Sequence, residues 1–199
     1  MANVRFVTPE GRTSFMKVYA PEENLAGKSV YSLKLLIPKS VNMNWIASKW
    51  KDACQEEFGT PSPPWLRPLF SAGNPFDDKG AIMDGDWKYE NVDEDKKEMY
   101  EDYRGHWVMN FSSPADKKPK VVDADKNEIL DQSEFQSGDY ARVVGEISTY
   151  VSRKLKTKQA SVNFKVVQKT RDGARFGGGM STDAALDMLP GLDGMDDVI

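Results

Sequence analysis

The fold of this 199-residue chain is decided by one stretch, ARVVGEISTYVSRKLKTKQASVNFKVV, which spans residues 141–167. Apolar or β-branched residues alternate with polar ones on both sides of a basic loop, at Ala141, Val143, Ile147, Thr149 and Val151 before it and at Val162, Phe164 and Val166 after it. A period of two in such residues indicates half-buried strands. The stretch therefore predicts two strands joined by a hairpin loop.

Three earlier segments show the same alternation, at residues 15–20, 31–37 and 107–112. In the first of them, one face carries Met16, Val18 and Ala20, and the other carries Phe15, Lys17 and Tyr19. A sixth, shorter strand is expected at 120–122. We find no internal repeat. The order strand, strand, insertion, then three strands is one that a five-stranded barrel can accommodate, so we expect a mainly β protein.

One helix interrupts the strands, at about residues 42–58. Its N-cap is expected at Asn42 or Asn44, and Gly59 is expected to end it. The apolar residues that recur at helical spacing are Ile46, Trp50, Ala53, Cys54 and Phe58. Four prolines between 61 and 68 prevent regular structure in the segment that follows.

Charge is strongly segregated, although the net charge is only −4. Residues 77–102 hold eleven acidic and four basic residues, and we expect a solvated, irregular excursion between strands there. Residues 140–179 hold nine basic residues against two acidic ones, a local charge of +7. Residues 181–199 hold five Asp and no basic residue, and they lack a periodic apolar face. We therefore expect a folded domain over 1–179 and a disordered acidic tail over 180–199.

The basic segment is the candidate site for a polyanion, because binding would relieve repulsion among its cations and release counterions. A solvated hairpin that uses lysines to deter edge-to-edge aggregation is the alternative. The charge continues beyond the hairpin, which favours nucleic acid. The expected phosphate contacts are Lys34, Arg142, Arg153, Lys154, Lys156, Lys158, Lys165, Arg171 and Arg175.

Aromatic residues lie on or beside the same strands, and bases stack on such rings without a sequence code. Tyr150 is the best candidate, because its strand face is polar and leads into the basic loop. Tyr31, Trp107 and Phe111 are further candidates, although the alternation that places Phe111 with Met109 and Phe164 with Val162 favours the core for these two phenylalanines. The glycine run at 177–179 suits either a hinge to the tail or a close approach to phosphates.

Catalytic alternatives have weak support. The chain has one cysteine and one histidine, Cys54 and His106, and nothing near either in sequence suggests a nucleophile pair. Asp84 and Asp86 would need further converging carboxylates to form a nuclease site. We expect no catalysis, no metal and no cofactor. Without a leader or an apolar run of about 20 residues, we expect a cytoplasmic protein that does not enter a membrane.

Several short motifs resemble a family of phage proteins, formerly a domain of unknown function, which are OB-fold single-stranded DNA (ssDNA) binding proteins. The matching segments, in the order of the family, are residues 28–39, 84–86, 103–110, 118–123, 137–142 and 167–173. The family is related in design to the ssDNA-binding protein of the short-tailed coliphages. The resemblance implies a five-stranded OB-fold barrel and sequence-independent ssDNA binding in phage DNA replication or recombination, in the cytoplasm of the infected bacterial host.

The same resemblance implies that the acidic tail contacts phage or host replication proteins. The tail residues concerned are Asp193, Met195, Asp196, Asp197, Val198 and Ile199. Tails of this design commonly finish on an aromatic residue, and this one departs from the pattern by finishing on Val198 and Ile199. The alternative function is a DNA mimic or protein-interaction inhibitor of a host enzyme, although a mimic has no need for the basic segment.

Overall fold

The computed structural model describes residues 3–24, 27–61, 66, 69–70, 81–151 and 158–176. The side chains of Asn3, Tyr150, Lys158 and Gln159 are not among the features it describes. In chain order the elements are β1 (Asn3–Val7), β2 (Gly11–Glu23), β3 (Ser29–Pro38), α1 (Asn44–Phe58), β4 (Ile82–Asp84), α2 (Gly85–Glu90), η1 (Glu94–Lys96), α3 (Lys97–Tyr100), η2 (Glu101–Tyr103), β5 (His106–Pro114), β6 (Lys120–Val122), η3 (Gln132–Glu134), β7 (Tyr140–Val151) and β8 (Lys158–Arg171).

Five of these strands close into a barrel in the order β2-β3-β5-β8-β7. The barrel closes where Gly11 and Arg12 of β2 pair with Ala141 and Tyr140 of β7. Strands β5 and β8 run parallel at their single pair, Ser112 with Asn163, and the other barrel pairings are antiparallel. This is the ring expected of a five-stranded OB-fold, so the predicted fold class is confirmed.

The alternation in the sequence decides which residues fill the barrel. In β3, Tyr31, Leu33, Leu35 and Ile37 are buried, and their partners across the register in β5 are Ser113, Phe111, Met109 and Trp107. Val143, Ile147, Val162 and Phe164 of β7 and β8 complete the core, together with Val167 in place of the expected Val166, because the register between β7 and β8 shifts between Val144 and Gly145. Fully burying a side chain of this size stabilises the fold by about 1.5–3 kcal/mol.

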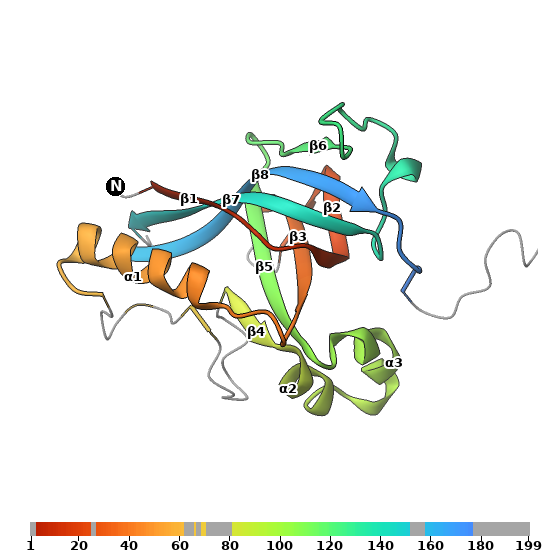
Figure 1. Ribbon diagram of the computed structural model, residues 1–199, viewed down its shortest axis with the longest axis horizontal. Helices are drawn as coiled ribbons and strands as arrows, with labels where there is room; N and C mark the ends of the chain where they lie inside the picture. The colour runs from red at the N-terminus through yellow and green to blue at the C-terminus, as the bar shows by residue number, and fades with distance from the viewer. Residues whose placement is uncertain are drawn as a thin grey trace, which may run out of the picture.

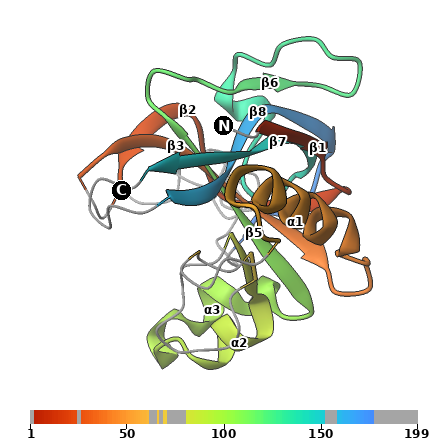
Figure 2. The ribbon, with the colours of Figure 1, turned by 90° about the vertical axis from the view of Figure 1, so that its left-hand side faces the viewer.

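Helix α1 covers the side of the barrel next to β1 and β7 (Figures 1 and 2). Four of the five residues predicted from helical spacing are buried, at Ile46, Trp50, Ala53 and Cys54, and the fifth, Phe58, is half-buried. Gly59 ends the helix with φ 72°, a left-handed conformation that glycine adopts without strain. The N-cap is Met43 rather than either asparagine, although the side chain of Asn42 accepts a hydrogen bond from the Asn44 amide.

Two strands were not expected from the sequence. Strand β1 pairs with β7 from Asn3 to Val7, and the three-residue β4 pairs with β5. The prediction of an irregular excursion at 77–102 is wrong for residues 81–102, because they form β4 and the short helices α2, η1, α3 and η2. We call residues 85–103 the α2–α3 insertion; it lies at the opposite end of the molecule from β6 (Figures 1 and 2).

Candidate nucleic-acid interface

The outward face of β2, β3 and β5 is polar in its middle. Register aligns Ser14 of β2 with Lys34 of β3, and Lys34 with Asn110 of β5. In the next row, Ser32 pairs with Lys17 and with Ser112. Toward the other end, the outward residues Leu36 and Val108 are buried in a second apolar cluster with Met83 and Tyr103. The α2–α3 insertion therefore borders this open polar face.

Phe15 stands at that border in an unusual backbone conformation. Its φ is 45°, which costs a non-glycine residue free energy, and its side chain is 39% exposed. The register between β2 and β3 shifts between Ser14 and Lys17, so that β2 has one extra residue in this interval. A large apolar ring is thereby held at the surface of the barrel.

Other rings and cations gather around Phe15. The ammonium of Lys34 lies 4.8 Å from the Phe15 ring centroid, and the Tyr100 ring lies 5.9 Å away. Tyr103, fully buried, meets the Phe15 and Tyr100 rings edge-on at 6.5 and 5.0 Å. Lys88 of α2 lies 5.3 Å from the Tyr100 ring. We call Phe15, Lys34, Lys88, Tyr100 and Tyr103 the Phe15 cluster; its chemistry suits nucleobases and phosphates.

The chain after β8 runs against the same region. Arg12 donates hydrogen bonds to the carbonyls of Gly138 and Ala174, forms an ion pair with Asp102 at 2.6 Å, and lies 4.1 Å from the Phe176 ring centroid. Phe176 packs against the second apolar cluster, which includes Tyr103. The last described residue of the chain is therefore fixed close to the Phe15 cluster.

Two of the predicted stacking residues are not at the surface. Tyr31 is 6% exposed and Phe111 is 2% exposed, and the Phe111 ring packs against Phe6 and Phe164 at 6.4 and 6.1 Å. The prediction that their rings face DNA is wrong, because both point into the barrel. Phe164 lies in the core, as the alternation favours. Trp107 is half-buried, with the Phe70 ring 5.6 Å away.

The predicted cations are spread over several faces. Lys34 belongs to the Phe15 cluster, and Arg142, Lys165 and Arg175 are exposed. Lys165 lies 3.8 Å from Glu146. Arg171 pairs with Glu10 at 3.1 Å and stacks on the Tyr140 ring.

The side chains of Tyr150, Arg153, Lys154, Lys156 and Lys158, and the tail residues named above, lie outside the described residues.

The sequence reasoning missed Phe15, Lys88 and Tyr100. A signal for Phe15 was present, because the alternation places it with Lys17 on the face opposite Met16 and Val18. A phenylalanine on the polar face of a strand is a candidate for surface contact. No comparable signal marks Tyr100, which lies in the acidic segment.

The residues of the catalytic alternatives have structural partners. Lys39 donates hydrogen bonds of 2.6 Å to both Asp84 and Asp86. The Lys39 hydrogen bond and a second one from the Gly105 amide hold the pKa of Asp86 below its usual value. Burial raises the pKa of the Cys54 thiol to about 11. Among the described residues, no group of three or more His, Cys, Asp or Glu side chains is arranged to hold a metal ion.

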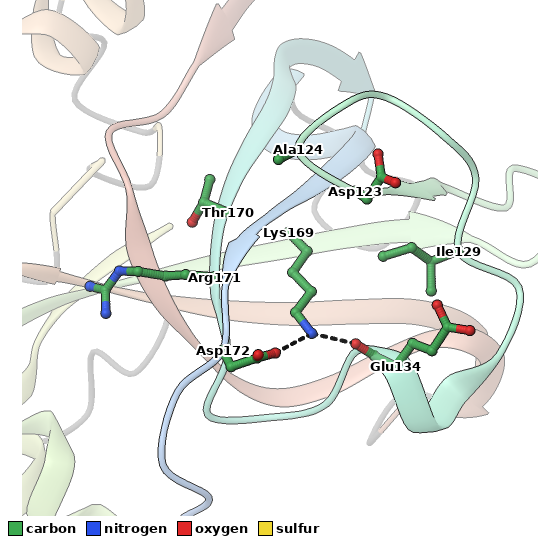
Figure 3. Close-up of a pocket in the computed structure, with 8 residues that line it drawn as sticks. All are labelled: Asp123, Ala124, Ile129, Glu134, Lys169, Thr170, Arg171 and Asp172. Atoms are coloured by element: carbon green, nitrogen blue, oxygen red, sulfur yellow. Dashed lines mark hydrogen bonds and ion pairs between the residues drawn. The ribbon is translucent and has the colours of Figure 1, made fainter.

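A hollow of about 400 Å³ lies between the end of β8 and the segment around η3 (Figure 3). Lys169 reaches across it, donates a hydrogen bond to the Glu134 carbonyl and pairs with Asp172, both at 2.5 Å. Burial lowers the pKa of Lys169, but Asp172 and Asp139 raise it by more, so that the pKa of Lys169 lies above its usual value. Arg171 points away from the hollow in this view. Lys169 thus ties the η3 segment to β8.

A family model for the ssDNA-binding protein of Enterobacter phage Enc34 matches residues 4–198. The search of curated proteins gave no match. Three of the similar solved structures are phage proteins. The single-stranded DNA-binding protein from bacteriophage Enc34 has a TM-score of 0.61 at 19% identity, over 88% of this chain and 85% of that one.

The same Enc34 protein in complex with ssDNA has a TM-score of 0.63 at 20% identity, over 87% of this chain and 89% of that chain. The single-stranded DNA binding protein gp2.5 of bacteriophage T7 has a TM-score of 0.52 at 16% identity, over 100% and 99% of the two chains. At these identities the structural likeness shows a shared fold. In the part of the chain that the structure describes, no helix is both long and apolar enough to cross a bilayer.

Proposed function

Because the chain belongs to the family of the Enterobacter phage Enc34 ssDNA-binding protein, we propose that it binds ssDNA without sequence preference and protects it during phage DNA replication or recombination. The observation that carries this proposal is the family match over residues 4–198, nearly the whole chain. A solved structure of the Enc34 protein with ssDNA supports it further. Binding and protection require no catalytic group, and we propose none.

The outward face of β2, β3 and β5 supports the proposal physically. The strands of an OB-fold that correspond to β3 and β5 are those that commonly contact oligonucleotides. Here that face offers Lys34 for phosphates and the Phe15 ring for a base, next to hydroxyl and amide side chains of Ser32 and Asn110. Stacking on a ring contributes about 1–3 kcal/mol per base and tolerates every base.

We assign the remaining phosphate contacts to the basic segment. They are Arg142, Arg153, Lys154, Lys156, Lys158, Lys165, Arg171 and Arg175. Tyr150 and the half-buried Trp107 are the further stacking positions. Single strands lose about 0.7 counterions per neutralised phosphate, so affinity should fall steeply as salt rises.

For the acidic tail we propose two roles. Its five carboxylates compete with DNA phosphates for the basic surface, since tethering keeps the tail at a high local concentration. Its end, from Asp193 to Ile199, contacts phage or host replication proteins in the cytoplasm of the infected cell. The position of Phe176 against the second apolar cluster supports the first role, because this last described residue before the tail lies close to the Phe15 cluster.

A salt titration of the full chain with ssDNA and with duplex DNA tests the proposal. We expect tighter binding to ssDNA, little difference among sequences, and a log–log salt slope that reports several phosphate contacts. Incubation with magnesium should leave the bound strand intact and protected from added nuclease. Cleavage of the strand would indicate a nuclease, and an absence of DNA binding together with capture of a host enzyme would indicate a mimic.

A further inference from the structure

Two neighbouring aromatic rings each carry a lysine ammonium over them. Lys34 lies 4.8 Å from the Phe15 centroid, and Lys88 lies 5.3 Å from the Tyr100 centroid. The two rings are 5.9 Å apart, with 32° between their planes. One ring and its lysine belong to the barrel, whereas the other pair belongs to the α2–α3 insertion.

We propose that these two lysine-capped rings bind two adjacent nucleotides, so that the DNA strand continues from the barrel onto the α2–α3 insertion. The inference rests on the proposed ssDNA binding and goes beyond it, because it assigns a binding role to an insertion that is acidic overall. Each lysine leaves its ring to meet a phosphate, and a base takes the place of the lysine on the ring.

The exchange is favourable for both partners. A cation over an exposed aromatic ring is held more weakly than a nucleobase stacked on that ring. The displaced ammonium gains a phosphate partner and releases a condensed counterion from the strand. The lysines therefore occupy the positions over the rings that the bases take when DNA binds.

Tyr103 keeps the two rings in place. It is fully buried, and its edge-to-face contacts with the Phe15 and Tyr100 rings fix the position of one ring relative to the other. Its hydroxyl lies 3.4 Å from the Ser14 hydroxyl in the strand that carries Phe15. A site held in this way loses little conformational entropy on binding.

The acidity of the insertion is largely neutralised by internal ion pairs. The insertion and Asp84, the residue before it, together contain nine carboxylates, and six of them pair with a lysine or arginine within 2.7 Å. The six are Asp84, Asp86, Asp93, Glu94, Glu101 and Asp102. Two of their partners, Arg12 and Lys39, come from the barrel strand β2 and from the residue after β3. A phosphate beside Lys88 therefore meets far less negative charge than the local sequence suggests.

The test measures binding of the full chain to fluorescent oligothymidylates by anisotropy. Tyr100→Ala should weaken affinity about 5- to 150-fold, the range that the loss of one stacked base gives. Tyr100→Phe should bind like the wild type, because the ring remains. Lys88→Gln should lower the log–log salt slope by about 0.7, and it removes no aromatic packing.

Tyr89→Ala is the matched control. Tyr89 belongs to the same insertion and has Arg104 5.1 Å from its ring, but its hydroxyl is hydrogen-bonded to the Glu101 carboxylate. A strand approaching this ring meets that carboxylate, so we expect unchanged affinity. An oligonucleotide carrying 5-iododeoxyuridine should crosslink to Tyr100 and Phe15 under ultraviolet light, but not to Tyr89.

The outcomes separate the two proposals. One outcome would overturn the inference: Phe15→Ala binds ssDNA weakly, whereas Tyr100→Ala keeps wild-type affinity and Lys88→Gln keeps the wild-type log–log salt slope. That outcome would show that DNA binds only to the barrel. Failure of the wild-type chain to bind ssDNA would overturn the proposed function itself. Thermal melts of each variant identify any loss of affinity that comes from unfolding.

Discussion

Replacing Phe15 by glycine should separate the binding role of this residue from its structural cost. The residue has φ 45°, where a side chain costs about 1–2 kcal/mol relative to ordinary backbone. Glycine adopts this conformation freely, so Phe15→Gly relieves the strain while it removes the ring. Phe15→Ala removes the same ring and keeps most of the strain.

The stability change can be worked out from the contacts of the ring. Phe15 is 39% exposed, and it meets the Tyr100 and Tyr103 rings and the Lys34 ammonium. Aromatic pairs contribute about 0.5–1.5 kcal/mol each and an exposed cation contact about 0.5–1 kcal/mol. Relief of strain offsets part of this loss in the glycine variant. After the greater unfolded-state entropy of glycine is counted, the glycine variant should be about 1 kcal/mol more stable than the alanine variant.

The assay combines thermal melting with ssDNA titration at fixed salt. For a chain of this size, 1 kcal/mol corresponds to about 2–4 °C in Tm, so Phe15→Gly should melt above Phe15→Ala by that amount. Both variants should lose about 1–3 kcal/mol of ssDNA affinity, because both lack the ring. Phe15→Tyr should retain affinity, since it keeps an aromatic face.

Two results would refute this reasoning. If Phe15→Gly bound ssDNA with wild-type affinity, Phe15 would not contact DNA, and the polar face of β3 and β5 would lack the main stacking ring assigned to it. A glycine variant less stable than the alanine variant would show that the backbone at this position is not strained. Each result bears on a different step, so they can be judged separately.

Three further predictions concern other parts of the chain. Replacing the four hairpin cations by alanine should lower the log–log salt slope of ssDNA binding by roughly 2 to 3, and an unchanged slope would place the footprint elsewhere. The four are Arg153, Lys154, Lys156 and Lys158. A chain that ends at Gly179 should bind ssDNA more tightly than the full chain at low salt, where charges act over a longer range. The difference in affinity should disappear at high salt. Equal affinities at both salt concentrations would show that the tail does not compete with DNA. The Cys54 thiol is fully buried, and burial raises its pKa to about 11. It should therefore resist a thiol reagent at pH 8.5 in the native protein and react after unfolding. Fast labelling of the native protein would contradict its burial.

The sequence predicts the barrel strands well because each strand has one face in the core and one in solvent. That arrangement leaves a period of two in the local sequence, as in Leu33 to Ile37. Helix α1 was likewise predictable, because Ile46, Trp50 and Ala53 follow the helical period. Strand β4 was not, because three residues are too few to establish a period. Its place is set by pairing with β5, which is distant in sequence.

The candidate site was harder to predict, because an aromatic ring suits both a core and a stacking surface. Alternation places Phe111 on the strand face of Met109, and Tyr31 on that of Leu33, and the structure buries both rings inside the barrel. Alternation does place Phe15 on the polar face of its strand. The register shift beside it, and the Lys34 and Tyr100 side chains that gather around it, depend on residues from other parts of the chain.

Some features of this protein follow from the local sequence, and others depend on contacts between distant parts of the chain. The sequence by itself determined the mainly β barrel, helix α1 and the segregation of basic and acidic residues, because these follow from composition and from periods within about a dozen residues. Only the tertiary structure decided that Lys39 pairs with Asp84 and Arg12 with Asp102, and that the rings of Phe15 and Tyr100 lie together. These pairs join residues that are 45, 90 and, for Phe15 and Tyr100, 85 positions apart in the sequence. Their electrostatic and stacking energies depend on distance in space, which local sequence does not encode.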